Sequence, residues 1–283
     1  MSGKIIDGKE IANSIHESLK NEIEELKSKT DKVPGLAVIL VGDDKASHKY
    51  VSMKEKACKK VGINSVVYRL DANTTEEEVL ELIDKLNKDE DINGILVQLP
   101  LPNGIGEKKI NANILPSKDV DGFHAVNTGK LFLGEEGFLP CTPKGIIKLI
   151  KSTDIEIEGK NAVVIGRSNI VGKPTALLLL RENATVTICH SRTRNLEEHI
   201  RNADIIVSAA GVADLVTETM VKDKAIVIDA GINFKDGKLV GDVDYINVKK
   251  KASWITPVPG GVGPMTIAML LENTVEAFKK KWS

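Results

Sequence analysis

Lys54 is the residue whose type and position first suggest chemistry. On the helix expected over residues 44–61, it lies near the middle of a face made of Ser47, Tyr50, Val51, Lys54, Cys58 and Val61. The neighbouring lysines fall on the opposite side of that helix, at Lys49, Lys56, Lys59 and Lys60. An inward lysine can lay its stem along apolar surface and reach water with its ammonium. Alternatively, it is a partly desolvated amine whose lowered pKa suits acid–base chemistry near neutral pH, and periodicity leaves both readings open.

Two polar residues further along the chain could serve the same site. Gln98 lies in an apolar stretch that indicates a buried strand, where a primary amide needs a partner. In a parallel sheet, the carboxyl end of that strand opens toward the rim that receives the start of the Lys54 helix. Asp121 follows Asp119 and precedes Gly122. A satisfied core glutamine and an ordinary Asp-Gly turn are the alternatives.

A glycine loop in the second half of the chain follows a short apolar strand. The strand is expected over residues 162–166, and the loop lies between Gly166 and Gly172. Pro174 lies near the first turn of the next helix, where proline is tolerated. Strand, glycine loop and helix direct backbone N–H groups and a positive helix end toward a phosphate. The loop does not match the G-x-G-x-x-G pattern of dinucleotide folds, so an ordinary turn is the alternative.

The end of the next expected strand, residues 185–190, is where a Rossmann fold selects its cofactor. A carboxylate there would hold the ribose hydroxyls of NAD, but this chain has Ser191, Arg192 and Arg194. Arg167 is also available, in the glycine loop. Basic and hydroxyl groups suit a 2′-phosphate, so the sequence favours NADP. A solvated basic loop is the alternative.

The composition limits the function classes. The 283 residues suffice for one large or two ordinary domains, and a formal net charge of −1 predicts neither nucleic acid nor a membrane as partner. No apolar run approaches the roughly 20 residues of a membrane span, and the N-terminus lacks a signal-peptide core. Three scattered cysteines suit reduced thiols, and the five histidines show no metal-ligand spacing. We therefore expect a cytoplasmic enzyme without a structural metal.

Two alternations of strand and helix organise the chain. In the first half we expect helices over 9–28, 44–61 and 74–87, and strands over 36–41, 65–70 and 94–102. Residues 103–143 are expected to be a long irregular connection. The second half indicates helices over 144–151, 172–182, 195–202, 214–221 and 265–281, strands over 162–166, 185–190, 204–209 and 225–230, and a hairpin over 234–243. The fold class is therefore α/β, with two units meeting near residue 140 and a ligand in the cleft between them.

Five segments together closely resemble the bifunctional methylenetetrahydrofolate dehydrogenase/methenyltetrahydrofolate cyclohydrolase family. Any one of them would be a weak signal, but five in order, at compatible spacing and over nearly the whole chain, are strong. They are Ser47-x-x-Tyr50-x-x-x-Lys54, Val-Gln-Leu-Pro-Leu-Pro at 97–102, Lys-Asp-Val-Asp-Gly at 118–122, the loop at 166–174, and the proline- and glycine-rich segment at 257–266.

The resemblance implies a homodimer of two-domain subunits with an active-site cleft between the domains. An N-terminal α/β catalytic domain, residues 1–140 and 265–283, would bind folate. A Rossmann-type parallel-sheet domain, residues 141–264, would bind NADP. The family's catalytic positions correspond to Lys54, Tyr50 and Gln98. Its substrate-binding positions correspond to Ser47, Tyr50, Val97, Gln98, Leu99, Asp121, Pro259, Gly260 and Gly263. Its cofactor-binding positions correspond to Gly166, Arg167, Ser168, Val171, Gly172, Ser191, Arg192 and Ile232, and no metal is implied.

The implied function is NADP-dependent oxidation of 5,10-methylenetetrahydrofolate, followed by hydrolysis of the methenyl product to 10-formyltetrahydrofolate. These reactions belong to one-carbon metabolism and supply purine biosynthesis. Lys54 would be the acid–base group, Gln98 would help to hold its protonation state, and Tyr50 would position it. A monofunctional dehydrogenase, a non-catalytic NADP-binding module and an unrelated Rossmann dehydrogenase are the alternatives. The X-Pro bonds at Leu99–Pro100 and Val258–Pro259 are candidates for the cis form.

Overall fold

The computed structural model describes residues 2–282, which form two compact units. The six-strand unit contains the residues up to Ala12 and Thr142–Thr266, and the three-strand unit contains Asn13–Cys141 and the residues from Ile267 onward. The division falls within two long helices, α1 (Gly8–Thr30) and α10 (Val262–Trp282). Within the described residues no helix is both long and apolar enough to cross a membrane.

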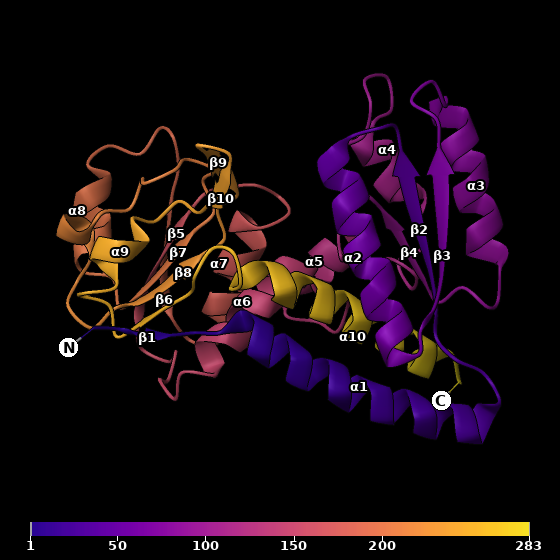
Figure 1. The fold of residues 1–283 in the computed structure, drawn as a ribbon, viewed down its shortest axis with the longest axis horizontal. Helices are drawn as coiled ribbons and strands as arrows, with labels where there is room; N and C mark the ends of the chain where they lie inside the picture. The colour runs from indigo at the N-terminus through magenta and orange to yellow at the C-terminus, as the bar shows by residue number, and fades with distance from the viewer. Residues whose placement is uncertain (1, 283) are drawn as a thin grey trace. The chain divides into compact units, whose positions relative to one another are not determined.

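The three-strand unit is built on a parallel sheet in the order β3-β2-β4 (Figure 1). The chain crosses from β2 to β3 and then returns past β2 to β4, in the opposite direction. Because crossovers between parallel strands are right-handed, the helices that make these two connections lie on opposite faces of the sheet. With helices on both faces, every residue of the central strand is buried. The elements are β2 (Gly35–Val41), α2 (Lys45–Val61), β3 (Asn64–Leu70), α3 (Glu76–Lys88), β4 (Gly94–Val97), α4 (Glu107–Asn113) and α5 (Ala125–Leu133).

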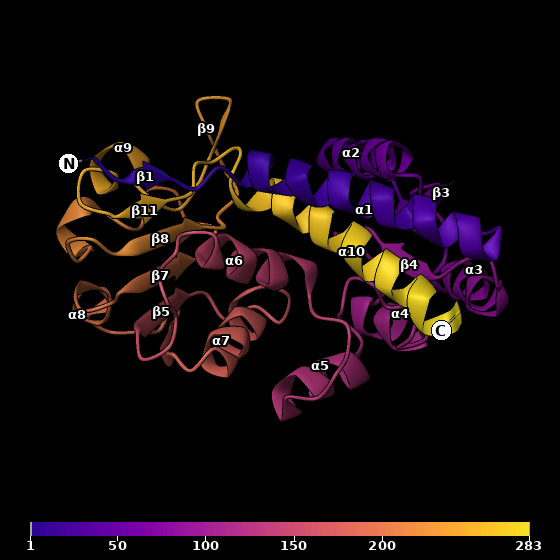
Figure 2. The same ribbon diagram turned by 90° about the horizontal axis from the view of Figure 1, so that it is seen from below.

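The six-strand unit is built on a parallel sheet in the order β1-β11-β8-β7-β5-β6 (Figures 1 and 2). An antiparallel hairpin of β9 and β10 turns at Asp236 and Gly237, both with positive φ. The elements are β1 (Lys4–Ile5), α6 (Cys141–Lys151), β5 (Asn161–Ile165), α7 (Gly172–Arg181), β6 (Thr185–Cys189), α8 (Leu196–Arg201), β7 (Ile205–Ser208), the 3₁₀ turn η1 (Glu218–Met220), β8 (Ile226–Asp229), β9 (Asn233–Lys235), β10 (Lys238–Val240), α9 (Tyr245–Val248) and β11 (Trp254–Ile255).

Most of the expected elements are confirmed to within a few residues, but three expectations were wrong. Residues 103–143 are not wholly irregular, because α4 and α5 form there; helices of two turns give little periodicity. Residues 214–221 form only a 3₁₀ turn, because Val216 pairs in parallel with Val243 and is extended. The strand expected over 94–102 ends at Val97, and two prolines that cannot donate to a ladder follow at Pro100 and Pro102.

The first residues of the chain also lie elsewhere than expected. The sequence placed them with the folate-binding domain, but Lys4 and Ile5 form β1, which pairs with Trp254 and Ile255 in the six-stranded sheet. A strand of two residues carries no usable alternation, so no sequence pattern reveals it.

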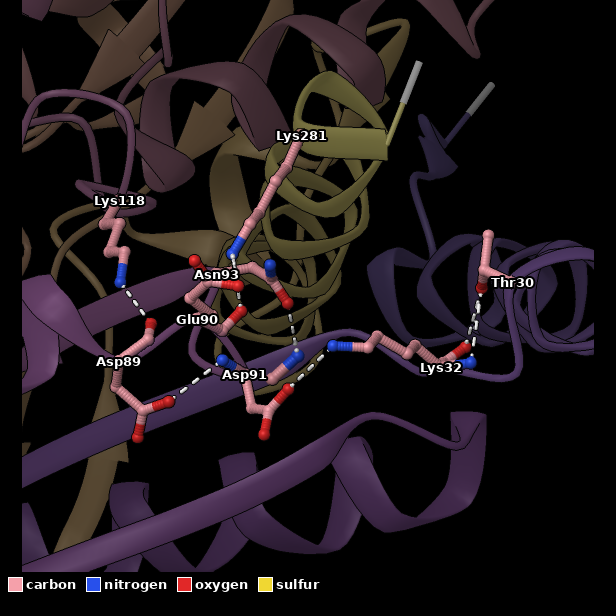
Figure 3. Close-up of polar contacts among 9 residues, drawn as sticks. Thr30, Lys32, Asp89, Glu90, Asp91, Asn93, Lys118 and Lys281 are labelled. Atoms are coloured by element: carbon pink, nitrogen blue, oxygen red, sulfur yellow. Dashed lines mark hydrogen bonds and ion pairs between the residues drawn. The ribbon is translucent and has the colours of Figure 1, made fainter.

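A polar turn fastens the amino end of β4 (Figure 3). The Asn93 side-chain oxygen accepts from the Gly35 N–H at 2.8 Å, and the Asn93 backbone N–H donates to the Gly35 carbonyl at 2.9 Å. Lys281 Nζ donates to the Glu90 carbonyl at 2.8 Å, and Lys32 Nζ lies 3.3 Å from Asp91 Oδ1. These contacts join α10 and the start of β2 to the turn, so the three-strand unit is closed by distant parts of the chain.

We expect the substitution Gly35→Ala to destabilise the protein by about 2–3 kcal/mol, because a Cβ at Gly35 would lie 1.9 Å from the Asp91 carbonyl oxygen. Gly129, inside α5, is a matched control because nothing lies within 4 Å of its Cβ position. There Gly129→Ala should stabilise by about 0.5–1 kcal/mol. Urea unfolding measures both, and an unchanged midpoint for Gly35→Ala would contradict the expected clash.

Candidate active site

Helix α2 presents Lys54 to the interior of the three-strand unit. The helix starts where the Asp44 carboxylate accepts from the Ser47 N–H at 2.7 Å, and it ends at Gly62, which takes the left-handed conformation (φ 93°). Its buried residues are Ser47, Val51, Lys54, Cys58 and Val61. The expected inward face is therefore confirmed, and Lys54 is only 9% exposed.

Gln98 is the partner that holds the Lys54 amine. Lys54 Nζ donates to Gln98 Oε1 at 3.0 Å. The other end of the amide, Nε2, donates to the Leu99 carbonyl at 2.6 Å, and this bond requires that Oε1 face the lysine. A neutral oxygen accepts from an amine as well as from an ammonium, so this contact fixes the nitrogen in both protonation states.

Asp121 is brought to the same end of β4 by a short parallel pairing. Ile95 bridges to Asp119, and its N–H donates to the Lys118 carbonyl at 2.8 Å. Asp121 stands two residues beyond Asp119, as Val97 stands two residues beyond Ile95, so it reaches the level where β4 ends. The buried Asp119 carboxylate accepts from the N–H groups of the two residues Phe123 and His124. The Asp119 carboxylate therefore stabilises the turn that contains Asp121.

Burial is the largest influence on the pKa values of Lys54, Asp121 and Cys58. Desolvation lowers the pKa of Lys54, while the nearby Asp121, Cys141 and Cys58 act in the opposite direction. Desolvation raises the pKa of Asp121, opposed by Lys54 and reinforced by Asp119. Burial also raises the pKa of the Cys58 thiol to about 11, so that residue stays a neutral thiol. Burial therefore moves the pKa of this amine and the pKa of this carboxyl towards each other, which suits proton transfer.

The other expected substrate-binding residues fall into both units. Tyr50 is half-buried one turn before Lys54 on α2, and Val97 ends β4. Leu99 is half-buried and joined to Pro100 by a cis peptide bond. Three more belong to the six-strand unit: Pro259, which follows Val258 through a second cis bond, Gly260 and Gly263.

The glycine loop lies at the carboxyl end of β5 in the six-strand unit. A Cβ at Gly166 would lie 2.3 Å from the Ala209 carbonyl oxygen. A Cβ at Gly172 would lie 2.2 Å from the Gly166 carbonyl oxygen. Only glycine fits at these two positions, because the backbone of the loop packs directly against other backbone atoms at the start of α7. Ser168 Oγ accepts from the Val171 and Gly172 N–H groups at 3.1 and 3.2 Å.

Exposed polar groups surround this loop. Arg167 and Ser168 follow Gly166, and Ser191 and Arg192 follow the adjacent strand β6. A backbone cradle beside two exposed guanidinium groups fits a dinucleotide with an added phosphate. Ile232 is 57% exposed after β8, at the same carboxyl edge of the sheet.

Two buried residues beside the Asp121 turn were missed from the sequence. Cys141 is 1% exposed; its Sγ donates to the Val120 carbonyl at 3.3 Å, and the thiol lowers the pKa of Asp121 against the effect of burial. Asn273 of α10 donates to the Val120 and Leu139 carbonyls at 2.8 and 3.0 Å. Its place on the apolar face of α10, four residues after Met269 and four before Ala277, is the signal that could have found it, since a buried amide needs partners. Among the described residues, no three His, Cys, Asp or Glu side chains are grouped to hold a metal ion.

Comparison with known families covers nearly the whole chain. Residues 6–121 match the model of the tetrahydrofolate dehydrogenase/cyclohydrolase catalytic domain, and residues 140–282 match the NAD(P)-binding domain of the same family. The bifunctional protein FolD of Bacillus subtilis is 56% identical over 284 residues, covering 100% of both chains.

Solved structures give the same result. The bifunctional FolD enzyme of Campylobacter jejuni superimposes with a TM-score of 0.97 at 54% identity, covering 99% of this chain and 100% of that one. The Trypanosoma brucei methylenetetrahydrofolate dehydrogenase-cyclohydrolase, solved with NADP cofactor and inhibitor, gives a TM-score of 0.96 at 39% identity and covers 100% and 99%. The chain therefore belongs to the tetrahydrofolate dehydrogenase/cyclohydrolase family.

Proposed function

We propose that this protein oxidises 5,10-methylenetetrahydrofolate with NADP+ and hydrolyses the methenyl product to 10-formyltetrahydrofolate. The observation that carries the proposal is the buried Lys54 amine, held 3.0 Å from Gln98 Oε1 and influenced by Asp121. A silent NADP-binding module has no need of such a group. A dehydrogenase without the second activity has no evident use for an amine whose pKa is lowered by burial.

We assign the two halves of the chemistry to the two units. The three-strand unit would bind the folate, and the six-strand unit would bind NADP at the loop between Gly166 and Gly172. Arg167, Ser168, Ser191 and Arg192 would hold the phosphates of the adenosine half. When bound, the nicotinamide ring supplies the hydride acceptor, and the chain contributes binding and orientation.

Lys54 acts as the acid–base group in the hydrolysis of the methenyl cation. Water adds to the cationic carbon, and the neutral amine takes up the proton that the water loses. The bond from that carbon to N5 then breaks while the ammonium returns a proton to N5. The hydroxyl group on the carbon loses its proton to solvent as the carbonyl forms, which leaves a formyl group on N10. Gln98 holds the nitrogen in place through both states, Tyr50 orients the lysine and the substrate, and Asp121 accepts hydrogen bonds from the pterin.

Three further assignments complete the proposal. The enzyme works as a homodimer in the cytoplasm, and its product provides formyl groups for purine biosynthesis. The family resemblance supports the dimer, which sedimentation velocity would test. All three cysteines are buried, and none of them forms a disulfide in the described structure, which supports a reducing compartment.

Lys54→Met should abolish methenyl hydrolysis, because no other group at this position can exchange the proton. The enzyme is mixed with methylenetetrahydrofolate and NADP+ or NAD+, and the formation and the disappearance of methenyltetrahydrofolate are followed separately. The control Lys56→Met changes an exposed lysine on the same helix and should leave both rates unchanged. NADP+ binding should survive in both variants. Retained hydrolysis in Lys54→Met would remove the lysine from the mechanism.

Asp121→Asn should move the pH profile of hydrolysis to lower pH. The Asp121 charge raises the pKa of Lys54 against the effect of burial, so its removal lowers that pKa further. The limb of the profile that follows the amine should therefore shift to lower pH. The rate constant for hydrolysis, measured between pH 6 and 10, checks this, and an upward shift would contradict the assignment of that limb to Lys54.

Arg192→Ala should weaken NADP+ binding by about tenfold or more and leave NAD+ binding unchanged, because one charge-assisted hydrogen bond to the 2′-phosphate is lost. Arg181 provides a matched control, since it is exposed in the last turn of α7, away from the glycine loop. Calorimetric titration with each nucleotide measures both variants. An equal loss for NADP+ and NAD+ would show that Arg192 does not read the 2′-phosphate.

A further inference from the structure

The buried carboxylate of Asp242 joins two loops of the six-strand unit. Its Oδ2 accepts from Ser208 Oγ at 3.0 Å and from the N–H groups of Ala210 and Gly211 at 2.7 and 3.2 Å. Its Oδ1 accepts from the Val212 N–H and from Asn233 Nδ2, both at 2.9 Å. Asp242 is 0% exposed, and all five of these donors are uncharged. A carboxylate can accept this many hydrogen bonds, whereas an amide cannot.

A second buried carboxylate, Asp229, fixes the first from the other side. It accepts from the Asp242 and Val243 N–H groups at 2.9 and 3.0 Å, and from the Gly231 N–H at 2.9 Å. A Cβ at Gly231 would lie 2.1 Å from Asp242 Oδ1, and one at Gly241 would lie 1.9 Å from Asp229 Oδ2. The two carboxylates are thus packed without space to move, and burial raises the pKa of Asp229 to about 6.

The loops that Asp242 joins follow β7 and β8, at the carboxyl edge where this class of sheet binds ligands. Each loop holds an apolar side chain in solvent: Val212 is 51% exposed and Ile232 is 57% exposed. In the sheet order, β7 and β8 lie on the side of β5 opposite to β6. A dinucleotide with its adenosine half at β6 and its phosphates at the β5 loop extends its other half over β7 and β8.

We propose that Asp242 is a positioning residue for the cofactor, which fixes the loops after β7 and β8 so that Val212 and Ile232 form the apolar wall for the nicotinamide half of NADP+. This inference rests on the proposed function. Asp242 itself is fully buried and acts only through the loops. Its loss should therefore weaken NADP+ binding without changing the hydrolysis of methenyltetrahydrofolate, which needs no nucleotide.

The test compares Asp242→Asn and Asn233→Ala with the wild-type enzyme. Asp242→Asn replaces one acceptor oxygen by a donor, whereas Asn233→Ala releases only the loop after β8 and keeps the carboxylate. Asp244→Asn is the control, because that carboxylate caps α9 and bonds to Asn247 rather than to either loop. The measurements are the melting temperature, the Kd for NADP+, the KM for NADP+ and kcat of oxidation, and the rate of methenyl hydrolysis.

We expect Asp242→Asn to raise the Kd and the KM for NADP+ at least tenfold, and Asn233→Ala to raise them less. Hydrolysis should stay within twofold of wild type in both, and Asp244→Asn should bind NADP+ normally. If Asp242→Asn fails to fold, a raised Kd in folded Asn233→Ala still supports the role. Wild-type NADP+ affinity in a folded Asp242→Asn or Asn233→Ala variant would overturn it and leave the proposed function intact. A wild-type protein that does not bind NADP+ would contradict both.

Discussion

The three-strand unit must accommodate a buried amine, that of Lys54. An ammonium loses hydration when it is buried, so Lys54 can remain inside only if its proton is easily given up and its nitrogen is held by hydrogen bonds. Gln98 provides the hydrogen bond, and Asp121 provides the charge that keeps the lowered pKa from falling further. The buried apolar positions beside Lys54 on α2 keep the amine from water, and this burial is what lowers its pKa.

The parallel sheets explain how such residues are assembled. Gln98 follows β4, and the Asp119–Asp121 segment pairs beside the same strand, so both polar groups arrive where strands end. The six-strand unit uses the same edge of its own sheet for the glycine loop, the arginines and the loops held by Asp242. In both units the strands position the candidate site residues that follow them.

The sequence contained enough to find the centre of the site but not its supports. Lys54 was identifiable because five other residues of one helical face agreed with an inward direction, and Gly166 and Gly172 because a strand and a helix flanked them. Asp242 and Asn273 make most of their hydrogen bonds to backbone groups far away in the chain, and no local pattern records those partners. The short elements were not predicted for a related reason. The strand β1 has two residues and is defined by its tertiary pairing, and the helix α4 has only two turns, so neither is long enough to show periodicity.

The pKa of Lys54 in the wild-type enzyme tests the central claim most directly. Titration of the lysine ¹³Cε resonances by NMR, with the Lys54 signal assigned from its absence in a Lys54→Met sample, gives this value without reference to any assay. We expect Lys54 to titrate clearly below the value of an exposed lysine, about 10.4. A Lys54 resonance that titrates at or above that value would show that the amine is solvated, and the proposed acid–base role would fail with it.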